Sequence, residues 1–238
     1  WDSAVEESSL IQNLKWRAGY LKKYLSSFTV YHFHDTSVSS PMRGDCNIND
    51  NEYLRDNGSN LAAFLYSMMQ NDETNFRLIE GVVSSIAPYF KCFKLRPDVN
   101  DKERIRLEWE EKETDMYLNG YSFSDGTLRF IALATLLLQS KTPEVIVIDE
   151  PELGLHPAAI NKFAELVKRA SNKSQIILST QSTNLVNCFD VKDIIVVDRI
   201  ESQSVFRHLS EEDLATWMDE YDLSISDLWE KNMIGGQL

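Results

Sequence analysis

Three apolar runs without alternation stand in the second half of the chain: EVIVID at 144–149, QIILS at 175–179 and DIIVVD at 193–198. Such runs are typical of parallel strands covered on both faces, because a strand with one wet face alternates between apolar and polar residues. A helical segment at 158–170 lies between the first two runs. The resulting β-α-β order predicts an α/β fold built on a parallel sheet.

The rest of the chain predicts helices and strands of other kinds. Residues 127–138 are apolar nearly all round, as expected of a helix enclosed on every side. Residues 37–60 form a long polar stretch rich in turn formers, and Ser59 or Asn60 at its end can cap a helix. We also expect helices at 8–27, 61–70 and 75–86, a strand at 28–33, a hairpin-like pair at 90–95 and 104–111, a strand at 204–209 and two short helices in the tail.

Two adjacent carboxylates, Asp149 and Glu150, close the first apolar run. A buried carboxylate without a partner costs several kcal/mol, so this pair needs solvent, a cation or a turn. Ligands of an open parallel sheet bind outside the carboxyl ends of its strands, and Gln181 follows the next strand at the same edge.

A third polar element, FSDG at 123–126, directly precedes the enclosed helix, with Ser124 or Asp125 as its expected cap. Free N–H groups at a helix start attract anions, and a glycine lets a phosphate approach closely. One arrangement uses all three elements: a nucleoside triphosphate with Mg²⁺, where Asp149 holds the metal through its water shell and Glu150 orients and deprotonates an attacking water.

The ordered segments FSDGTLR, VIVIDEPELGLHP and ILSTQS resemble the C-terminal lobe of an ABC-type ATPase head of the RecF, SMC and OLD group. YHFHDTS, DNGSNLAAFLY, SDGTLRFIALATLLL and the terminal LWEKNMIGG extend this to a bacterial family of RecF-like predicted AAA ATPases along nearly the whole chain. The resemblance implies a P-loop NTPase-like α/β fold, with a parallel sheet and flanking helices. Residues 1–120 would be a helical and strand region with a long polar loop, part of the head and its insertion, and 121–238 the C-terminal ATPase lobe.

By the resemblance, Ser124, Asp125 and Gly126 correspond to the signature motif. In ABC-type heads the signature serine and glycine touch the γ-phosphate bound by the opposite subunit, so ATP joins two heads head to tail. A helix N-terminus placed in this way supplies partial positive charge to a phosphate that is already held. The resemblance therefore implies a second copy of the head as partner.

Asp149 and Glu150 correspond to the Walker B pair, the ELGLHP segment to the D-loop and Gln181 to the switch position. The switch residue of ABC ATPases is usually histidine. Gln181 can donate a hydrogen bond to a γ-phosphate but cannot carry a proton or a positive charge. We expect sensing to survive while turnover slows.

The chain lacks the phosphate-binding loop of these ATPases, because none of its nine glycines precedes a lysine and no GxxxxGK[ST] occurs. In the family this loop lies in an N-terminal lobe, ahead of the position matched by Trp1. We therefore expect the chain to be a C-terminal fragment that binds nucleotide weakly or not at all by itself. The missing N-terminal lobe would be its partner in the complete ATPase.

Composition limits the partners and the compartment. The net charge is −13 and no Lys/Arg-rich block occurs, which argues against a broad electrostatic grip on nucleic acid by this chain alone. DNA maintenance or defence against phage is implied only by family analogy. The three cysteines show no CxxC spacing, and no apolar run approaches the ~20 residues of a membrane span. We expect a soluble, cytoplasmic protein that does not bind membranes.

Other interpretations stay open beside the ATPase. The absent P-loop would also fit an interaction or regulatory module that keeps the fold without catalysis. A nuclease would need a further acid cluster, such as a Toprim domain, for which the chain leaves no room. His32 and His34 lie on one face of a short strand, but no third metal ligand follows at a typical spacing. Arg129 fits a structural ion pair and a phosphate contact equally well, and His156 is expected at a loop or helix start.

Overall fold

The computed structural model describes residues 19, 28–114, 116–210, 214 and 223–236. Apart from Gly19, the helix predicted at 8–27 lies outside the described residues, as does most of the first of the two tail helices. The second tail helix is α9 (Ile225–Glu230). The predicted domain boundary between residues 120 and 121 stays a prediction.

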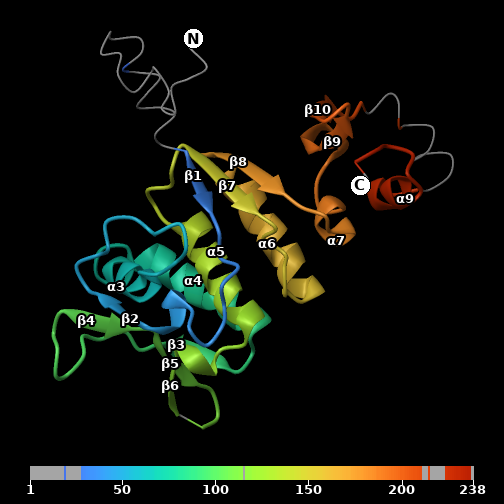
Figure 1. The fold of residues 1–238 in the computed structure, drawn as a ribbon. Coiled ribbons are helices and arrows are strands. Elements are labelled where there is room, and N and C mark those ends of the chain that lie inside the picture. The colour runs from blue at the N-terminus through green and yellow to red at the C-terminus, as the bar shows by residue number, and fades with distance from the viewer. Residues whose placement is uncertain (1–18, 20–27, 115, 211–213, 215–222, 237–238) are drawn as a thin grey trace.

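A three-stranded parallel sheet lies at the centre of the molecule (Figure 1). Its order is β1 (Thr29–Tyr31), β7 (Val145–Asp149) and β8 (Gln175–Ser179). The helix α6 (Pro157–Ala170) connects β7 to β8, and both neighbouring pairs of strands are parallel. The predicted β-α-β unit is confirmed.

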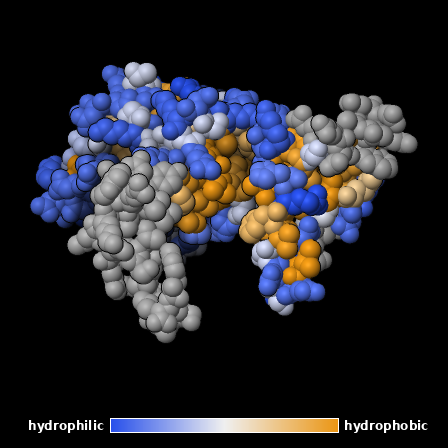
Figure 2. Space-filling view, turned by 90° about the horizontal axis from the view of Figure 1, so that it is seen from above, coloured by the Kyte–Doolittle hydropathy of each residue, from blue (hydrophilic) through white to orange (hydrophobic). Residues whose placement is uncertain are grey.

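One face of this sheet is open, contrary to the prediction that its strands are covered on both faces. The register places Val30, Val147 and Ile177 in one row across the three strands. Val30 is 42% exposed and Ile177 45%, whereas Ile146 and Ile148 on the opposite face are buried. The prediction was wrong because an apolar run shows only that both faces of a strand are hydrophobic. The helices in the described part of the chain cover one of these faces. Figure 2 shows exposed hydrophobic surface in the centre of the molecule.

The third apolar run does not join the parallel sheet, which also corrects the sequence analysis. It forms β9 (Ile195–Ile200), which pairs antiparallel with β10 (Gln203–His208) in a separate hairpin. The two residues between the strands, Glu201 and Ser202, have φ of 49° and 66°. Positive φ at both positions is the geometry of a tight hairpin turn, which is usually signalled by Asn-Gly or Asp-Gly. The Glu-Ser sequence carries no such signal.

Three more helices, together with α6, form the main core with the covered face of the sheet. They are α3 (Leu61–Asn71), α4 (Glu73–Ile86) and α5 (Asp125–Leu138), and α5 contacts both α4 and α6. The prediction that α5 is enclosed is confirmed, because every residue from Leu128 to Leu138 is buried. Asn60 is the N-cap residue of α3, but its side chain bonds to the preceding loop rather than to the helix.

Short antiparallel strands lie beside these helices (Figure 1). One pair is β2 (Asp45–Asn47) with β4 (Arg104–Arg106), and a second sheet has the order β3 (Phe90–Phe93), β5 (Glu108–Glu111) and β6 (Tyr117–Asn119). The predicted hairpin-like pair is confirmed in the antiparallel pairing of β3 with β5. The run predicted as one strand at 104–111 divides into β4 and β5 around the buried Leu107.

A smaller hydrophobic cluster joins the C-terminal elements. It includes residues of α7 (Thr183–Val186), η3 (Val191–Asp193), β9 and α9. Its fully buried centre is Leu228. The remaining short elements are η1 (Pro41–Arg43) and η2 (Gly120–Ser122). Among the helices that the structure describes, none has the length and apolar character needed to span a bilayer.

Glu110 on β5 supports a prediction about acid stability. Hydrogen bonds from Lys91 and Lys94 lower the pKa of the Glu110 carboxyl from 4.5 to about 2. A lowered pKa in the folded state stabilises the fold above the ordinary pKa, and this contribution is lost as the pH falls through the folded-state value. We therefore expect the wild type to lose stability relative to E110Q between about pH 4.5 and 2, measured by urea unfolding at constant ionic strength. Parallel curves for the two proteins would contradict the pairing.

Candidate functional site

The ends of β7 and β8 meet at one edge of the parallel sheet, as the sequence predicted. Asp149 is the register partner of Ser179, and the Ser179 hydroxyl donates a hydrogen bond to the Asp149 carboxylate. The main-chain N–H of Glu150 donates to the Ser179 carbonyl at 3.0 Å. Gln181 follows two residues later and is exposed. The two acids and the switch segment therefore share one rim.

Glu150 leaves the strand in an unusual conformation. Its φ is 39°, in the left-handed region that a residue with a side chain rarely adopts. The N–H of Leu153 donates to the Glu150 carbonyl, so the chain turns at this residue. Such backbone geometry costs on the order of 1–3 kcal/mol and is concentrated at functional sites. It sets the direction in which the half-buried carboxylate leaves the strand.

The start of α5 is organised by Ser124. Its side chain accepts a hydrogen bond from the N–H of Thr127 at 3.2 Å, so Ser124 rather than Asp125 is the cap. Asp125 instead pairs with Arg43, with a distance of 2.7 Å between the guanidinium and carboxylate atoms. The Ser124 side chain stays exposed.

Arg43 is a site residue that the sequence analysis missed. Its side chain is only 5% exposed, and the guanidinium also donates to the carbonyls of Thr36, Gly120 and Phe123. These bonds fix the polypeptide that leads into Ser124. No motif marks this arginine, which lies in the long polar loop and meets its partners only after folding.

Gly126 packs against the turn that follows Glu150. A Cβ atom built on Gly126 would lie 2.4 Å from the carbonyl oxygen of Gly154. The predicted role of this glycine was to let a phosphate approach closely. Its packing against Gly154 is a second reason why the position has no side chain. The first turn of α5 and the 152–157 segment are thereby held together.

Arg129 lies buried between the end of β1 and this turn. Its guanidinium donates to the carbonyls of Phe33 and His34 at 2.9 and 2.8 Å. Burial lowers the pKa of Arg129, and the charges of Asp125 and Glu152 oppose that shift. Of the two roles left open for Arg129, the geometry shows the structural one. The predicted structural role was an ion pair, whereas the hydrogen bonds of Arg129 go to main-chain carbonyls.

Glu152 is a second residue that the sequence analysis did not single out. Its Oε1 accepts a hydrogen bond from the Thr180 hydroxyl, which ties the turn to the end of β8. Its Oε2 is buried and has no hydrogen-bond partner among the described residues. At the end of the same turn, His156 caps α6 by accepting from the N–H of Ala158, as expected of a helix-start residue.

Loss of Arg129 should weaken the fold. R129A would leave the carbonyls of Phe33 and His34, one buried and one part-buried, without their Arg129 donors, and we expect it to lower the free energy of unfolding by about 3 kcal/mol. R129K keeps the charge but not the fork of donors, so its loss should be intermediate. The measurement is urea unfolding, with R199A on the exposed part of β9 as the matched control. An R129A variant as stable as R199A would show that these bonds contribute little.

The described contacts bring the acid pair to the end of β8 and the start of α5 to the turn that follows the acid pair. Asp149 and Glu150 contact the end of β8, and Gly126 contacts the turn that follows Glu150. Among the described residues, no hydrogen bond joins Ser124 to Asp149. The catalytic, metal-binding and nucleotide-binding roles of these residues stay predictions.

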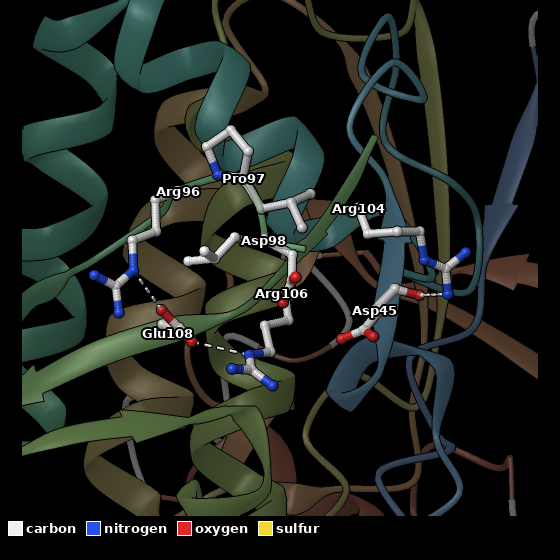
Figure 3. A pocket seen from close by; sticks show the side chains of 9 residues that line it. Asp45, Arg96, Pro97, Asp98, Arg104, Arg106 and Glu108 are labelled. Atoms are coloured by element: carbon white, nitrogen blue, oxygen red, sulfur yellow. Dashed lines mark hydrogen bonds and ion pairs between the residues drawn. The ribbon is translucent and has the colours of Figure 1, made fainter. Parts of the chain in front are cut away.

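A separate hollow on the β2–β4 pair is a poorer candidate (Figure 3). It has a volume of ≈ 50 Å³, whereas small-molecule pockets hold roughly 300 Å³ or more. Arg96 and Arg106 both donate to Glu108, so much of the positive charge in the hollow is already paired. Figure 3 shows these side chains directed at one another across its rim.

The chain is similar to several known proteins. A family model described as "AAA domain, putative AbiEii toxin, Type IV TA system" matches residues 33–187, more than half of the chain. An ABC transporter A family member 11 of Dictyostelium discoideum is 30% identical over 111 residues, covering 42% of this chain and 13% of the relative. The Old nuclease of Escherichia phage P2 is 31% identical over 111 residues, covering 42% and 19%. The chain thus spans under a fifth of the length of these two relatives.

A solved structure of an Smc head bound to the C-winged helix domain of ScpA shares the fold. It aligns with a TM-score of 0.50 at 21% identity, over 63% of this chain and 47% of the other. The predicted P-loop NTPase-like α/β fold is confirmed. The similarity to the ABC, RecF and SMC group, first indicated by the motifs, agrees with the family match.

Proposed function

The chain belongs to this AAA-domain family of ABC/RecF/SMC-type ATPases, and from that membership we propose that it is the C-terminal part of a magnesium-dependent ATPase. The observation that carries the proposal is the joined edge of β7 and β8. There Asp149 is held by Ser179, and Glu150 turns out of the strand in a left-handed conformation. Acids and switch segment lie together where an open parallel sheet binds its ligands.

The side chains at this edge suit a hydrated magnesium ion. The Asp149 carboxylate is half-buried, accepts one hydrogen bond from Ser179 and forms no ion pair with any described residue. Carboxylate oxygen is a ligand that Mg²⁺ prefers, either directly or through water. Such an ion would neutralise negative charge on the bound triphosphate. Asp149 would hold its water shell.

Glu150 and Gln181 take the steps that act on water and phosphate. Glu150 accepts a hydrogen bond from the attacking water, orients it and takes its proton. The Gln181 amide donates a hydrogen bond to the γ-phosphate. Because an amide carries no positive charge, the developing negative charge is stabilised less than it would be by a protonated histidine, and we expect slow turnover.

The start of α5 serves a second copy of the protein. Ser124 is exposed at the helix N-terminus, where N–H groups and the helix dipole favour an anion. Arg43 pairs with Asp125 and so reduces its repulsion of a phosphate. We assign Ser124 and Gly126 to the γ-phosphate held by the opposite head, with ATP joining the two copies.

The triphosphate would be bound mainly by a P-loop in an N-terminal lobe. This sequence does not contain a P-loop motif. We further propose a cytoplasmic protein in which ATP-driven pairing is coupled to DNA maintenance or to defence against phage. The family supports this setting by analogy alone.

Phosphate release by the protein that includes the N-terminal lobe tests the proposal. We expect hydrolysis with Mg²⁺ and none with EDTA. The absent P-loop favours a second candidate, a non-catalytic interaction module. A start codon just before Trp1, together with no ATP binding, would support that module and reject the ATPase.

A further inference from the structure

His32 and His34 project from the same side of the chain that extends β1. Tyr31 and Phe33 alternate with them and are buried, with 3% and 2% exposure. Successive side chains of an extended segment point to opposite sides, so the two histidines share the side turned away from the core. His32 is exposed and His34 is half-buried.

Asp149 supplies the third ligand, which the sequence analysis did not find at a typical spacing. The parallel register pairs Tyr31 with Ile148, so the residues that follow, His32 and Asp149, stand side by side at the strand ends. One ring nitrogen from each histidine and one carboxylate oxygen of Asp149 all lie within 4.8 Å of one another. A single ion can reach three groups at this spacing with small side-chain adjustments.

Neighbouring bonds hold this cluster in place. His34 Nε2 donates to the main-chain carbonyl of Asp149 at 2.8 Å, so one ligand residue fixes the ring of another. Arg129 holds the His34 carbonyl, and the N–H of His32 donates to the Asp56 carbonyl at 2.9 Å. Ser179 holds the Asp149 carboxylate. Ligands that are oriented before binding raise metal affinity, because little order is lost when the ion arrives.

We propose that His32, His34 and Asp149 bind one divalent transition-metal ion, with Zn²⁺ as the representative ion. Two imidazoles and one carboxylate are the donors of open zinc sites, in which water or substrate completes the coordination. Magnesium prefers an all-oxygen shell, so the two imidazoles favour a transition metal over Mg²⁺ at this position. The binding does not require nucleotide. It shares only Asp149 with the proposed ATPase, so an ion held here would control the residue assigned to magnesium.

The test is titration of the whole chain with Zn²⁺ in the absence of nucleotide, by competition with a chromophoric chelator. We expect one ion per chain, and a loss of affinity of more than about tenfold in H32A and in D149N. H208A is the matched control, because His208 is exposed on β10 and belongs to no cluster of metal-binding side chains in the described part of the chain. Circular dichroism establishes that each variant is folded. H32A is the decisive variant, since the His32 ring is exposed.

Cobalt gives a second readout that identifies the donors. Co²⁺ bound by nitrogen and oxygen should show visible d–d bands without the near-ultraviolet charge transfer of a thiolate. Equal Zn²⁺ affinity in the wild type and H32A, or thiolate bands from the cysteines, would overturn the proposal. Because neither measurement involves ATP or Glu150, its failure leaves the ATPase untouched, and a failure of ATP hydrolysis leaves the metal site untouched.

Discussion

E150Q lowers the rate of ATP hydrolysis by at least about 100-fold while ATP binding persists: this is the expected result for the protein that contains both ATPase lobes. A general base contributes roughly 100- to 10,000-fold to a rate, so kcat should fall by that factor. Glutamine has nearly the shape of glutamate but cannot accept the proton of the attacking water. The substitution also preserves the left-handed main chain at Glu150, whose N–H bonds to Ser179. Phosphate release measures the first effect and nucleotide binding at equilibrium the second.

E144Q provides the matched control for this experiment. Glu144 is exposed and directly precedes β7, at the opposite end of the strand from Glu150. The same chemical change there should leave kcat within about twofold, because surface substitutions away from special features have small effects. If E150Q hydrolysed ATP as fast as E144Q, Glu150 would not be the base. If E150Q lost ATP binding as well, its role would lie in binding rather than in turnover.

The part of the fold that the sequence predicted depends on local pattern. The β-α-β unit was readable because two apolar runs flank an amphipathic helix, and α5 because its apolar residues leave no polar face. Prediction failed where the structure of a segment depends on which other segments pair with it or pack against it. β9 reads like a buried parallel strand, yet a two-residue turn of positive φ folds it onto β10. The run of β8 likewise does not reveal that one of its faces is open.

Residues of the candidate site were likewise predictable only where local sequence determines their position. Asp149, Glu150 and the residues near Gln181 could be assigned to one rim from strand polarity alone, because parallel strands end at the same edge. Arg43 could not, since three of its four bonds reach Gly120, Phe123 and Asp125, which are far from it in the sequence. His34 and Asp149 are separated by 115 positions, and only the pairing of β1 with β7 brings them together.

Two glycine-to-alanine substitutions should shift stability in opposite directions. In G126A the new methyl group would stand 2.4 Å from the Gly154 carbonyl oxygen, and both sides of this contact are main chain. Relief requires α5 or the 152–157 turn to move, so we expect a loss of about 2 to 3 kcal/mol. In G81A the methyl group meets nothing within 4 Å on the exposed face of α4. Alanine's higher helix propensity should stabilise this variant by about 0.5 to 1 kcal/mol.

Urea unfolding of both variants beside the wild type separates packing from propensity. Both replacements add one methyl group to a helix, so any common effect on the unfolded chain cancels in their difference. That difference should reach about 3 kcal/mol, with the midpoint of G126A below and that of G81A above the wild type. Equal midpoints would mean that α5 does not pack on the turn as described. The contact that holds the start of α5 against the turn after Glu150 would then be lost, and with it the structural support for a fixed helix N-terminus that serves the opposite head.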